Sequence, residues 1–209
     1  MPLLLLFDTE TTGLPKSRSA SALRGPNTWP DMVSIAWSVS DSNSDSDSNS
    51  DGTQNKKSYS IIKPVGWTIP ANSIRFHGIT QEKAEAEGRP LADVMAEFRE
   101  DVEKCSHIIA HNMEFDKNVV FNAYAWRLRK DPRKFWKDEA EFCSLQKSKD
   151  ELKIPGKYPK PGDLYKMPSL DELWVATFGE PIPSNAHSAD RDVEVLQKIV
   201  WARWKDLFN

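Results

Sequence analysis

The stretch Leu3-Leu4-Leu5-Leu6-Phe7-Asp8-Thr9-Glu10 sets the expected architecture, because a short apolar run leads directly into two carboxylates. Five consecutive apolar residues have the length of a central strand that is covered on both faces. Side chains alternate along a strand, so Asp8 and Glu10 point to the same side if the strand continues through Glu10. This end of the strand is the first candidate for a functional site.

The segments that follow predict two more strands and then a run of helices. Residues 33–39 alternate apolar with small residues, which predicts a half-buried strand, and 59–63 predicts its partner. Helical spacing predicts helices over 91–102, 115–128, 170–178 and about 188–207, with short strands at 107–111 and around 142 and an irregular connection over 151–168. Hairpin-length links join the early strands and helical crossovers join the later ones. The order therefore predicts an α/β fold with a mixed sheet.

Composition excludes several classes of protein. The 209 residues carry 28 Lys and Arg against 31 Asp and Glu, and this net charge of −3 argues against a wholly basic nucleic-acid coat. Two cysteines cannot form a disulfide framework. No apolar run approaches the ~20 residues of a membrane span, and the start is too short for a signal peptide. We expect no membrane partner and an intracellular, cytoplasmic location, with the nucleus as the alternative.

One domain over residues 1–209 is expected, with an acidic Ser/Asp insert at about 40–57. An insert of this composition is a solvated loop at a hairpin tip. The segment Asp47-Ser48-Asn49-Ser50-Asp51-Gly52 also fits the first half of a calcium loop, although Ser58 stands where such a loop has Glu. A calcium-responsive interaction protein is therefore one alternative.

Further carboxylates are expected to join Asp8 and Glu10. Asp116 follows a turn after the predicted strand at 107–111, and ligands in open α/β sheets gather at the carboxyl ends of strands. Asp192 opens the last helix, five residues after His187. Four converging acids would repel one another unless cations neutralised them, and hard oxygen ligands favour Mg²⁺ or Mn²⁺. Four negative charges match two divalent ions, an arrangement that serves in-line displacement at phosphorus.

Three motifs resemble those of the DEDDh 3′–5′ exonucleases, the DnaQ-like branch of the RNase H-like superfamily. They stand in family order and are Phe7-Asp8-Thr9-Glu10-Thr11-Thr12-Gly13-Leu14, His111-Asn112-Met113-Glu114-Phe115-Asp116 and His187-x-Ala189-x-x-Asp192. His77-Gly78-Ile79-Thr80 matches a further family segment. The resemblance implies a three-layer RNase H-like fold, in which helices flank a five-stranded mixed sheet.

The same resemblance implies an activity and a set of site residues. The reaction would release nucleoside 5′-monophosphates from the 3′ end of single-stranded nucleic acid, with DNA favoured and two Mg²⁺ or Mn²⁺ as cofactors. Metal binding would fall to Asp8, Glu10, Asp116 and Asp192, and His187 would be the general base. The implied contacts to the terminal nucleotide are Thr11, Leu14, His77, Ile79 and Asn112.

Two further alternatives stay open at this point, an RNA-trimming exonuclease and a non-catalytic nucleic-acid-binding module. A polymerase and a second copy of the chain are the candidate protein partners. Residues 126–166 hold 12 Lys and Arg against 7 Asp and Glu, interleaved with aromatic residues. This segment either binds nucleic acid along its length or forms a solvated helix end. We favour the solvated helix end for most of its residues.

Overall fold

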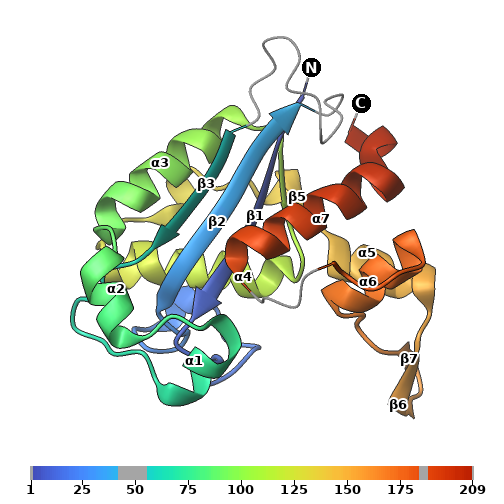
Figure 1. Cartoon of the computed structure of the whole chain (residues 1–209), viewed down its shortest axis with the longest axis horizontal. Helices are drawn as coiled ribbons and strands as arrows, with labels where there is room; N and C mark the ends of the chain where they lie inside the picture. Colours follow the sequence, from blue (N-terminus) through green and yellow to red (C-terminus); the bar gives the residue numbers. More distant parts are fainter. Residues whose placement is uncertain (1, 42–55, 184–187, 209) are drawn as a thin grey trace.

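The computed structural model describes residues 2–41, 56–183 and 188–208, with a five-stranded sheet at its centre (Figure 1). The strand order is β3-β2-β1-β4-β5. β1 pairs antiparallel with β2 and parallel with β4, while β2 and β3 are antiparallel and β4 and β5 are parallel. The predicted RNase H-like α/β fold with a mixed sheet is confirmed. The strands are β1 (Leu3–Thr11), β2 (Met32–Asp41), β3 (Lys56–Ile61), β4 (His107–Ala110) and β5 (Glu141–Cys143).

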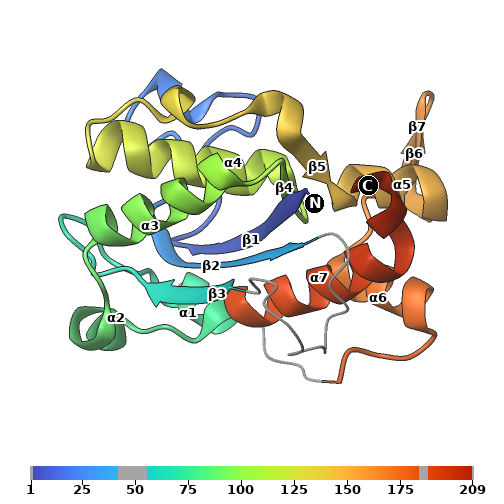
Figure 2. The ribbon, with the colours of Figure 1, turned by 90° about the horizontal axis from the view of Figure 1, so that it is seen from above.

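Helices cover both faces of this sheet (Figures 1 and 2). On one face, Leu5 and Phe7 share a core with residues of α3 and α4; on the other, Leu4 and Leu6 share a core with α6 and α7. This alternation confirms that β1 is a central strand covered on both sides. The helices are α1 (Ala71–His77), α2 (Gln81–Glu87), α3 (Leu91–Lys104), α4 (Met113–Asn122), α5 (Ser144–Leu152), α6 (Leu170–Phe178) and α7 (Ala189–Trp204). Among the described residues, every helix is too short or too polar to span a bilayer.

β2 corrects the expectation of a half-buried strand, because its residues from Met32 to Ser40 are all buried. Trp37 packs edge-on against Phe98 of α3. The alternate positions are serines and one alanine, and they face α7, where Gln197 lies 3.5 Å from the hydroxyl of Ser40. These serines are small enough to let a helix pack over them. The small polar residues that alternate along β2 therefore face a covering helix and not solvent.

Three helices were missed and one connection was misread from the sequence. Helices α1, α2 and α5 were not predicted, and residues 155–165, within the expected irregular connection at 151–168, form a hairpin. Its strands are β6 (Pro155–Lys160) and β7 (Asp163–Tyr165), and it projects from the body of the protein (Figure 1). Pro161 and Gly162 join the strands, and Gly162 has a φ of 83°. Proline supplies the fixed negative φ of such a tight turn, and glycine supplies the positive φ. The Pro-Gly dipeptide was therefore the sequence signal for this turn.

The predicted helices in the second half are confirmed, with shifted ends. Ser169 and Glu172 form a reciprocal cap at the start of α6, and Gly179 ends this helix in the left-handed conformation. α4 is continued by the π-helical turn η2, and α7 by the 3-10 turn η5. The short turns are η1 (Ala22–Arg24), η2 (Ala123–Arg127), η3 (Pro132–Lys134), η4 (Asp138–Ala140) and η5 (Lys205–Phe208).

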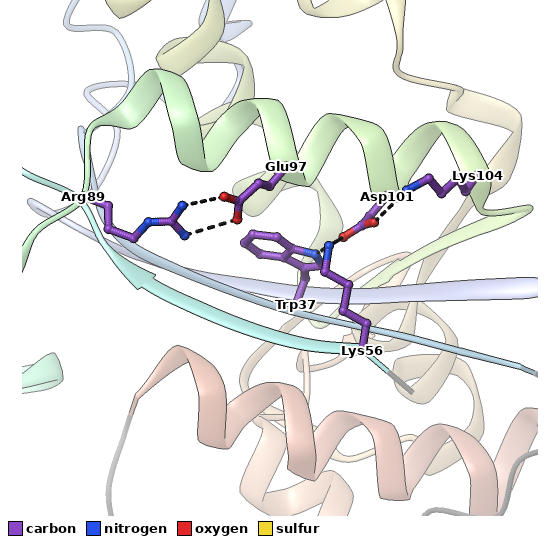
Figure 3. A network of polar contacts seen from close by, with 6 residues as sticks. All are labelled: Trp37, Lys56, Arg89, Glu97, Asp101 and Lys104. Carbon is purple, nitrogen blue, oxygen red and sulfur yellow. Dashed lines mark hydrogen bonds and ion pairs between the residues drawn. The ribbon is translucent and has the colours of Figure 1, made fainter. Parts of the chain in front are cut away.

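A polar network fastens α3 to the edge of the sheet (Figure 3). The buried carboxylate of Asp101 accepts a hydrogen bond from Trp37 Nε1 at 2.8 Å and pairs with Lys56 Nζ at 2.5 Å. At the start of the helix, Arg89 donates two hydrogen bonds to the carboxylate of Glu97. Lys56 begins β3, so the network holds the outer strand of the sheet directly beside α3.

Candidate active site

β1 and α7 bring three of the predicted carboxylates together. β1 runs through Thr11, so Asp8 and Glu10 share one face of the sheet, which is the face that α7 covers. Asp192 lies in the first turn of α7. One carboxylate oxygen from each of Asp8, Glu10 and Asp192 lies within 4.8 Å of the others. Residues from the two ends of the chain therefore form one acidic cluster.

Asp116 approaches the same strand from α4. Pairing between β1 and β4 ends at Leu6 and Ile109, so the N–H of Thr9 lies beyond the last paired residue on that side. This N–H donates to Asp116 Oδ1 at 3.1 Å, and the Thr9 hydroxyl donates to the same oxygen at 2.7 Å. Asp116 is only 2% exposed. Thr9 thus holds a buried carboxylate beside the strand that carries Asp8 and Glu10.

The four acids perturb one another strongly. Burial, followed by the charges of Asp116, Asp192 and Glu10, raises the pKa of Asp8 well above its ordinary value. Burial and then the charge of Asp192 raise the pKa of Glu10 to about 7. Burial also raises the pKa of Asp116 to about 7, although the hydrogen bonds from Thr9 oppose this rise. The charges of all three other carboxylates raise the pKa of Asp8, so Asp8 is the electrostatic centre of the site.

This donor set fits a hard divalent cation. All the candidate ligand atoms are carboxylate oxygens, which Mg²⁺ and Mn²⁺ prefer over nitrogen or sulfur. A cation would offset the burial of these carboxylates and their mutual repulsion, which together raise their pKa values. Within the described ranges, no other group of three or more His, Cys, Asp or Glu side chains comes as close together.

A pocket of about 450 Å³ lies beside the cluster, with Glu10 in its wall. Three of the predicted nucleotide contacts line it, namely Thr11, Leu14 and His77. Leu14 is 73% exposed and Phe76 is 74% exposed, so the mouth of the pocket has an apolar rim. A flat apolar group could settle on this rim while its polar part reaches the carboxylates.

Phe76 was not predicted as a site residue because the helix that carries it, α1, was not predicted. Pro70 stands immediately before this helix, and Gly78 ends it with a φ of 71°. A proline at the start and a left-handed glycine at the end are helix signals that the sequence did contain. The same glycine turns the chain after His77, which places that ring in the wall of the pocket.

The other predicted site residues lie in different surroundings. Ile79 is buried in a small satellite core, and its N–H donates to His77 Nδ1 at 3.0 Å. Asn112 adopts a left-handed φ of 82° before α4 and lines a separate hollow of about 690 Å³ with Lys117. His187 lies outside the described residues, as does the calcium-loop segment 47–52.

His111 holds the turn that precedes α4. Its Nε2 lies 3.2 Å from the carbonyl oxygen of Pro168, and its Nδ1 lies 2.9 Å from Ser144 Oγ. A carbonyl only accepts, so Nε2 carries the proton and Nδ1 accepts from the serine. Burial lowers the pKa of His111 to about 4, which keeps the ring neutral. This neutral ring connects the carboxyl ends of two strands to the segment after β7.

The family model described as "Exonuclease" (RNase T) matches residues 5–200. This chain belongs to that exonuclease family. The match includes β1 from Leu5 onward, the first turn of α4 and the first turn of α7, which carry the four carboxylates. Membership confirms the resemblance to DnaQ-like exonucleases of the RNase H-like superfamily. Among curated protein sequences, none matches this exonuclease-family chain significantly.

Solved structures of exonuclease I share the fold of this exonuclease-family chain. E. coli exonuclease I in complex with a dT13 oligonucleotide superposes with a TM-score of 0.68 at 21% identity, covering 100% of this chain and 43% of that one. An exonuclease I structure that suggests how processivity is achieved gives a TM-score of 0.69 at 22% identity, covering 100% and 42%. The E. coli enzyme with a dA16 oligonucleotide gives 0.68 at 19%, again covering 100% and 42%. This chain therefore spans less than half the length of these neighbours.

Proposed function

We propose that the chain is a metal-dependent 3′–5′ exonuclease that releases nucleoside 5′-monophosphates from single-stranded nucleic acid, with DNA preferred. The observation that carries the proposal is the convergence of Asp8, Glu10 and Asp192 oxygens within 4.8 Å, beside Asp116. Membership of the exonuclease family supports it, as does the fold shared with exonuclease I, which has been solved with dT13 and dA16. In this proposal residues 1–209 form one exonuclease domain, and the acidic insert at about 40–57 is an addition between β2 and β3.

The four carboxylates hold two Mg²⁺ or Mn²⁺ ions in this proposal. When bound, such ions neutralise the cluster, activate a water molecule and stabilise the charge that develops at phosphorus. Thr9 contributes by directing one oxygen of Asp116 with two hydrogen bonds, which leaves the other oxygen for a ligand. Asp8 and Glu10 provide negative charge from the face of the sheet beneath α7, and Asp192 adds a further charge from the first turn of α7.

His187 is assigned the role of general base. It stands five residues before Asp192, in the segment that leads into α7. An imidazole with a pKa near neutrality is suited to accept a proton from the attacking water. A reduction of kcat by about 10²–10⁴-fold on substitution of His187 with alanine would be the usual scale for such a group.

The pocket beside Glu10 receives the 3′-terminal nucleotide. Its apolar rim of Leu14 and Phe76 accepts the base, while Thr11 and His77 face the sugar. Ile79 acts through its neighbour, because its backbone N–H orients the His77 ring. Asn112 serves the next nucleotide from the separate hollow that it lines with Lys117.

The test is degradation of matched 5′-labelled single-stranded DNA and RNA with Mg²⁺, Mn²⁺ or EDTA, beside the Asp8→Asn variant. We expect a one-nucleotide ladder from the 3′ end that disappears with EDTA and in the variant. The polymer that is degraded faster decides between a DNA enzyme and an exoribonuclease. Intact oligonucleotides under every condition would contradict the proposal and favour a binding module.

A further inference from the structure

The catalytic end of this chain is poorly suited to attract a polyanion. The net charge is −3, and four carboxylates gather at the candidate active site. Proteins that bind single strands obtain affinity from cations that pair with phosphates and from aromatic rings that stack on bases. Residues 127–134 hold five Lys and Arg against one Asp, which is a strong local excess of positive charge. The position of these cations therefore decides whether they can pair with the phosphates of a bound strand.

Part of this segment lines a basic hollow of about 500 Å³ beyond the end of α4. Its cations are Arg129, Lys130 and Arg133, and the rest of the wall is formed by Asp131 and by the apolar side chains of Leu23, Ala125, Trp126 and Pro132. Arg133 is paired with Asp131 at 2.9 Å. Arg129 and Lys130 are exposed and have no acidic partner within the described part of the chain. Two free cations thus stand beside a partly exposed indole ring.

The backbone around the basic hollow is rigidly held. Trp126 Nε1 donates to the carbonyl of Ala22 at 2.8 Å, and Arg127 makes two hydrogen bonds to Asp31 at 2.6 and 2.7 Å. Both side chains are thereby hydrogen-bonded to the segment that precedes β2. Arg129 then takes a left-handed φ of 55°, which turns the chain directly after the π-helical turn η2. π-Helical turns and non-glycine residues with positive φ are both found often at functional sites.

The basic hollow and the candidate active site lie along the same helix. Asp116 is in the first turn of α4, and the hollow that contains Asn112 also includes Lys117 and Phe121 of that helix. Continuing through η2, the helix leads to Arg129. The 17 residues from Asn112 to Arg129 span about 25 Å at helical rise. This distance corresponds to about seven nucleotides if the strand keeps the ~3.4 Å rise of a stacked strand.

We propose that the basic hollow is a distal binding site for the single-stranded segment upstream of the 3′ end. Arg129 and Lys130 pair with phosphates, and a base stacks on the ring of Trp126. This inference rests on the proposed exonuclease function. A nucleic acid is favoured over an acidic peptide because the hollow combines cations with an indole and lies at the far end of the helical segment, α4 continued by η2, that begins beside Asp116.

The test compares a double variant, Arg129→Gln with Lys130→Gln, with a control that removes the same charge from elsewhere. The control is Lys198→Gln with Lys205→Gln, at exposed positions of α7 and η5. A 5′-labelled 20-nucleotide DNA is degraded with Mg²⁺, and the rate is read at each length of the ladder. We expect wild type and control to slow once the strand is shorter than about seven nucleotides. The double variant should be roughly tenfold slower above that length and equal to wild type below it.

Binding of the same 20-nucleotide strand in EDTA gives a readout that does not depend on turnover. Loss of two phosphate contacts should reduce the slope of log affinity against log salt by about 1.4. A double variant with wild-type rates at every length and an unchanged salt slope would overturn the distal site. A glutamate-rich peptide of equal charge that competes as well as the DNA would also overturn it, in favour of a protein partner. If wild type degrades no strand at all, the proposed exonuclease function fails, and the binding slope still tests the hollow.

Discussion

Thr9 donates two hydrogen bonds to one oxygen of Asp116, from its N–H at 3.1 Å and from its hydroxyl at 2.7 Å. The N–H is available because β4 stops pairing with β1 at Leu6. The difference in length between two parallel strands therefore positions a carboxylate from the following helix. This relationship makes Thr9 a positioning residue for the candidate active site, and it can be tested directly.

Substitution of Thr9 with valine should weaken activity because it removes the hydroxyl and keeps the shape and the backbone bond. A hydrogen bond to a charged group contributes about 1.5–3 kcal/mol. We expect kcat/KM to fall by about tenfold or more, measured on a 5′-labelled strand at pH 8. Thr9→Ser, which retains the hydroxyl, is the control and should keep most of the activity. A fully active valine variant would show that the backbone bond alone is sufficient.

The Asp8→Asn variant should be at least as stable as wild type in EDTA. Its side chain is half-buried and its pKa is raised by the charges of three other carboxylates, so replacement with a neutral amide relieves repulsion. Differential scanning calorimetry should show an equal or higher Tm, and added Mg²⁺ should raise the Tm of the variant less than that of wild type. A marked fall in the Tm of the variant would mean that Asp8 has a structural role.

Stability without divalent ions should decrease with rising pH. The folded-state pKa values of Glu10 and Asp116 are about 7, above ordinary values of 4.5 and 3.8. The folded protein therefore holds protons that the unfolded chain has already released, and this stabilisation is complete below about pH 4. The Tm in EDTA should fall between pH 4 and 7 and level off above. Stabilisation by Mg²⁺ should increase over the same range, since metal and protons compete for the same oxygens. A Tm in EDTA that rises from pH 5 to 7.5 would contradict these assignments.

Asp101 should matter for stability and not for catalysis. Burial opposes its charge, but hydrogen bonds from Lys56 and Trp37 outweigh this and lower the pKa of Asp101 (Figure 3). Its replacement with alanine leaves the Trp37 N–H without its partner, at a cost of about 1–3 kcal/mol in the free energy of unfolding. Urea denaturation measures this cost. Replacement of the exposed Glu100 on the same helix with alanine is the control and should change stability by less than about 0.5 kcal/mol.

Phe76 should contribute to substrate binding with little effect on folding. Its side chain is 74% exposed on the rim of the pocket, so truncation to alanine removes almost no buried surface. If the terminal base stacks there, the lost contact is worth about 1–3 kcal/mol, and KM should rise by roughly five- to 100-fold with Tm unchanged. Val65 is exposed to a similar degree but lies outside the lining of this pocket, and Val65→Ala serves as the control. An unchanged KM would remove Phe76 from the binding surface.

Local sequence patterns predicted the elements that depend on local physics. The apolar run before Asp8 has strand length, and Ser169 and Gly179 supply the cap and the stop of α6. Patterns failed where packing between distant segments decides the outcome. The serines of β2 were predicted to be solvent-exposed because no nearby sequence pattern indicates that α7, far away in the chain, covers them.

The sequence by itself determined the chemistry of the site: four carboxylates, in three motifs of one family and in the order in which the chain presents them. It also set the alternation that places Asp8 and Glu10 on one face, because the period of a strand is a local property. Tertiary structure decided that Asp192 lies beside Asp8 and Glu10, and that Thr9 donates hydrogen bonds to Asp116. It also decided that α1 contributes Phe76 to the lining of the pocket. These placements depend on where β4 ends and on how α1 and α7 pack against the sheet. Such contacts join residues far apart in the chain, and no local pattern encodes the distances between them.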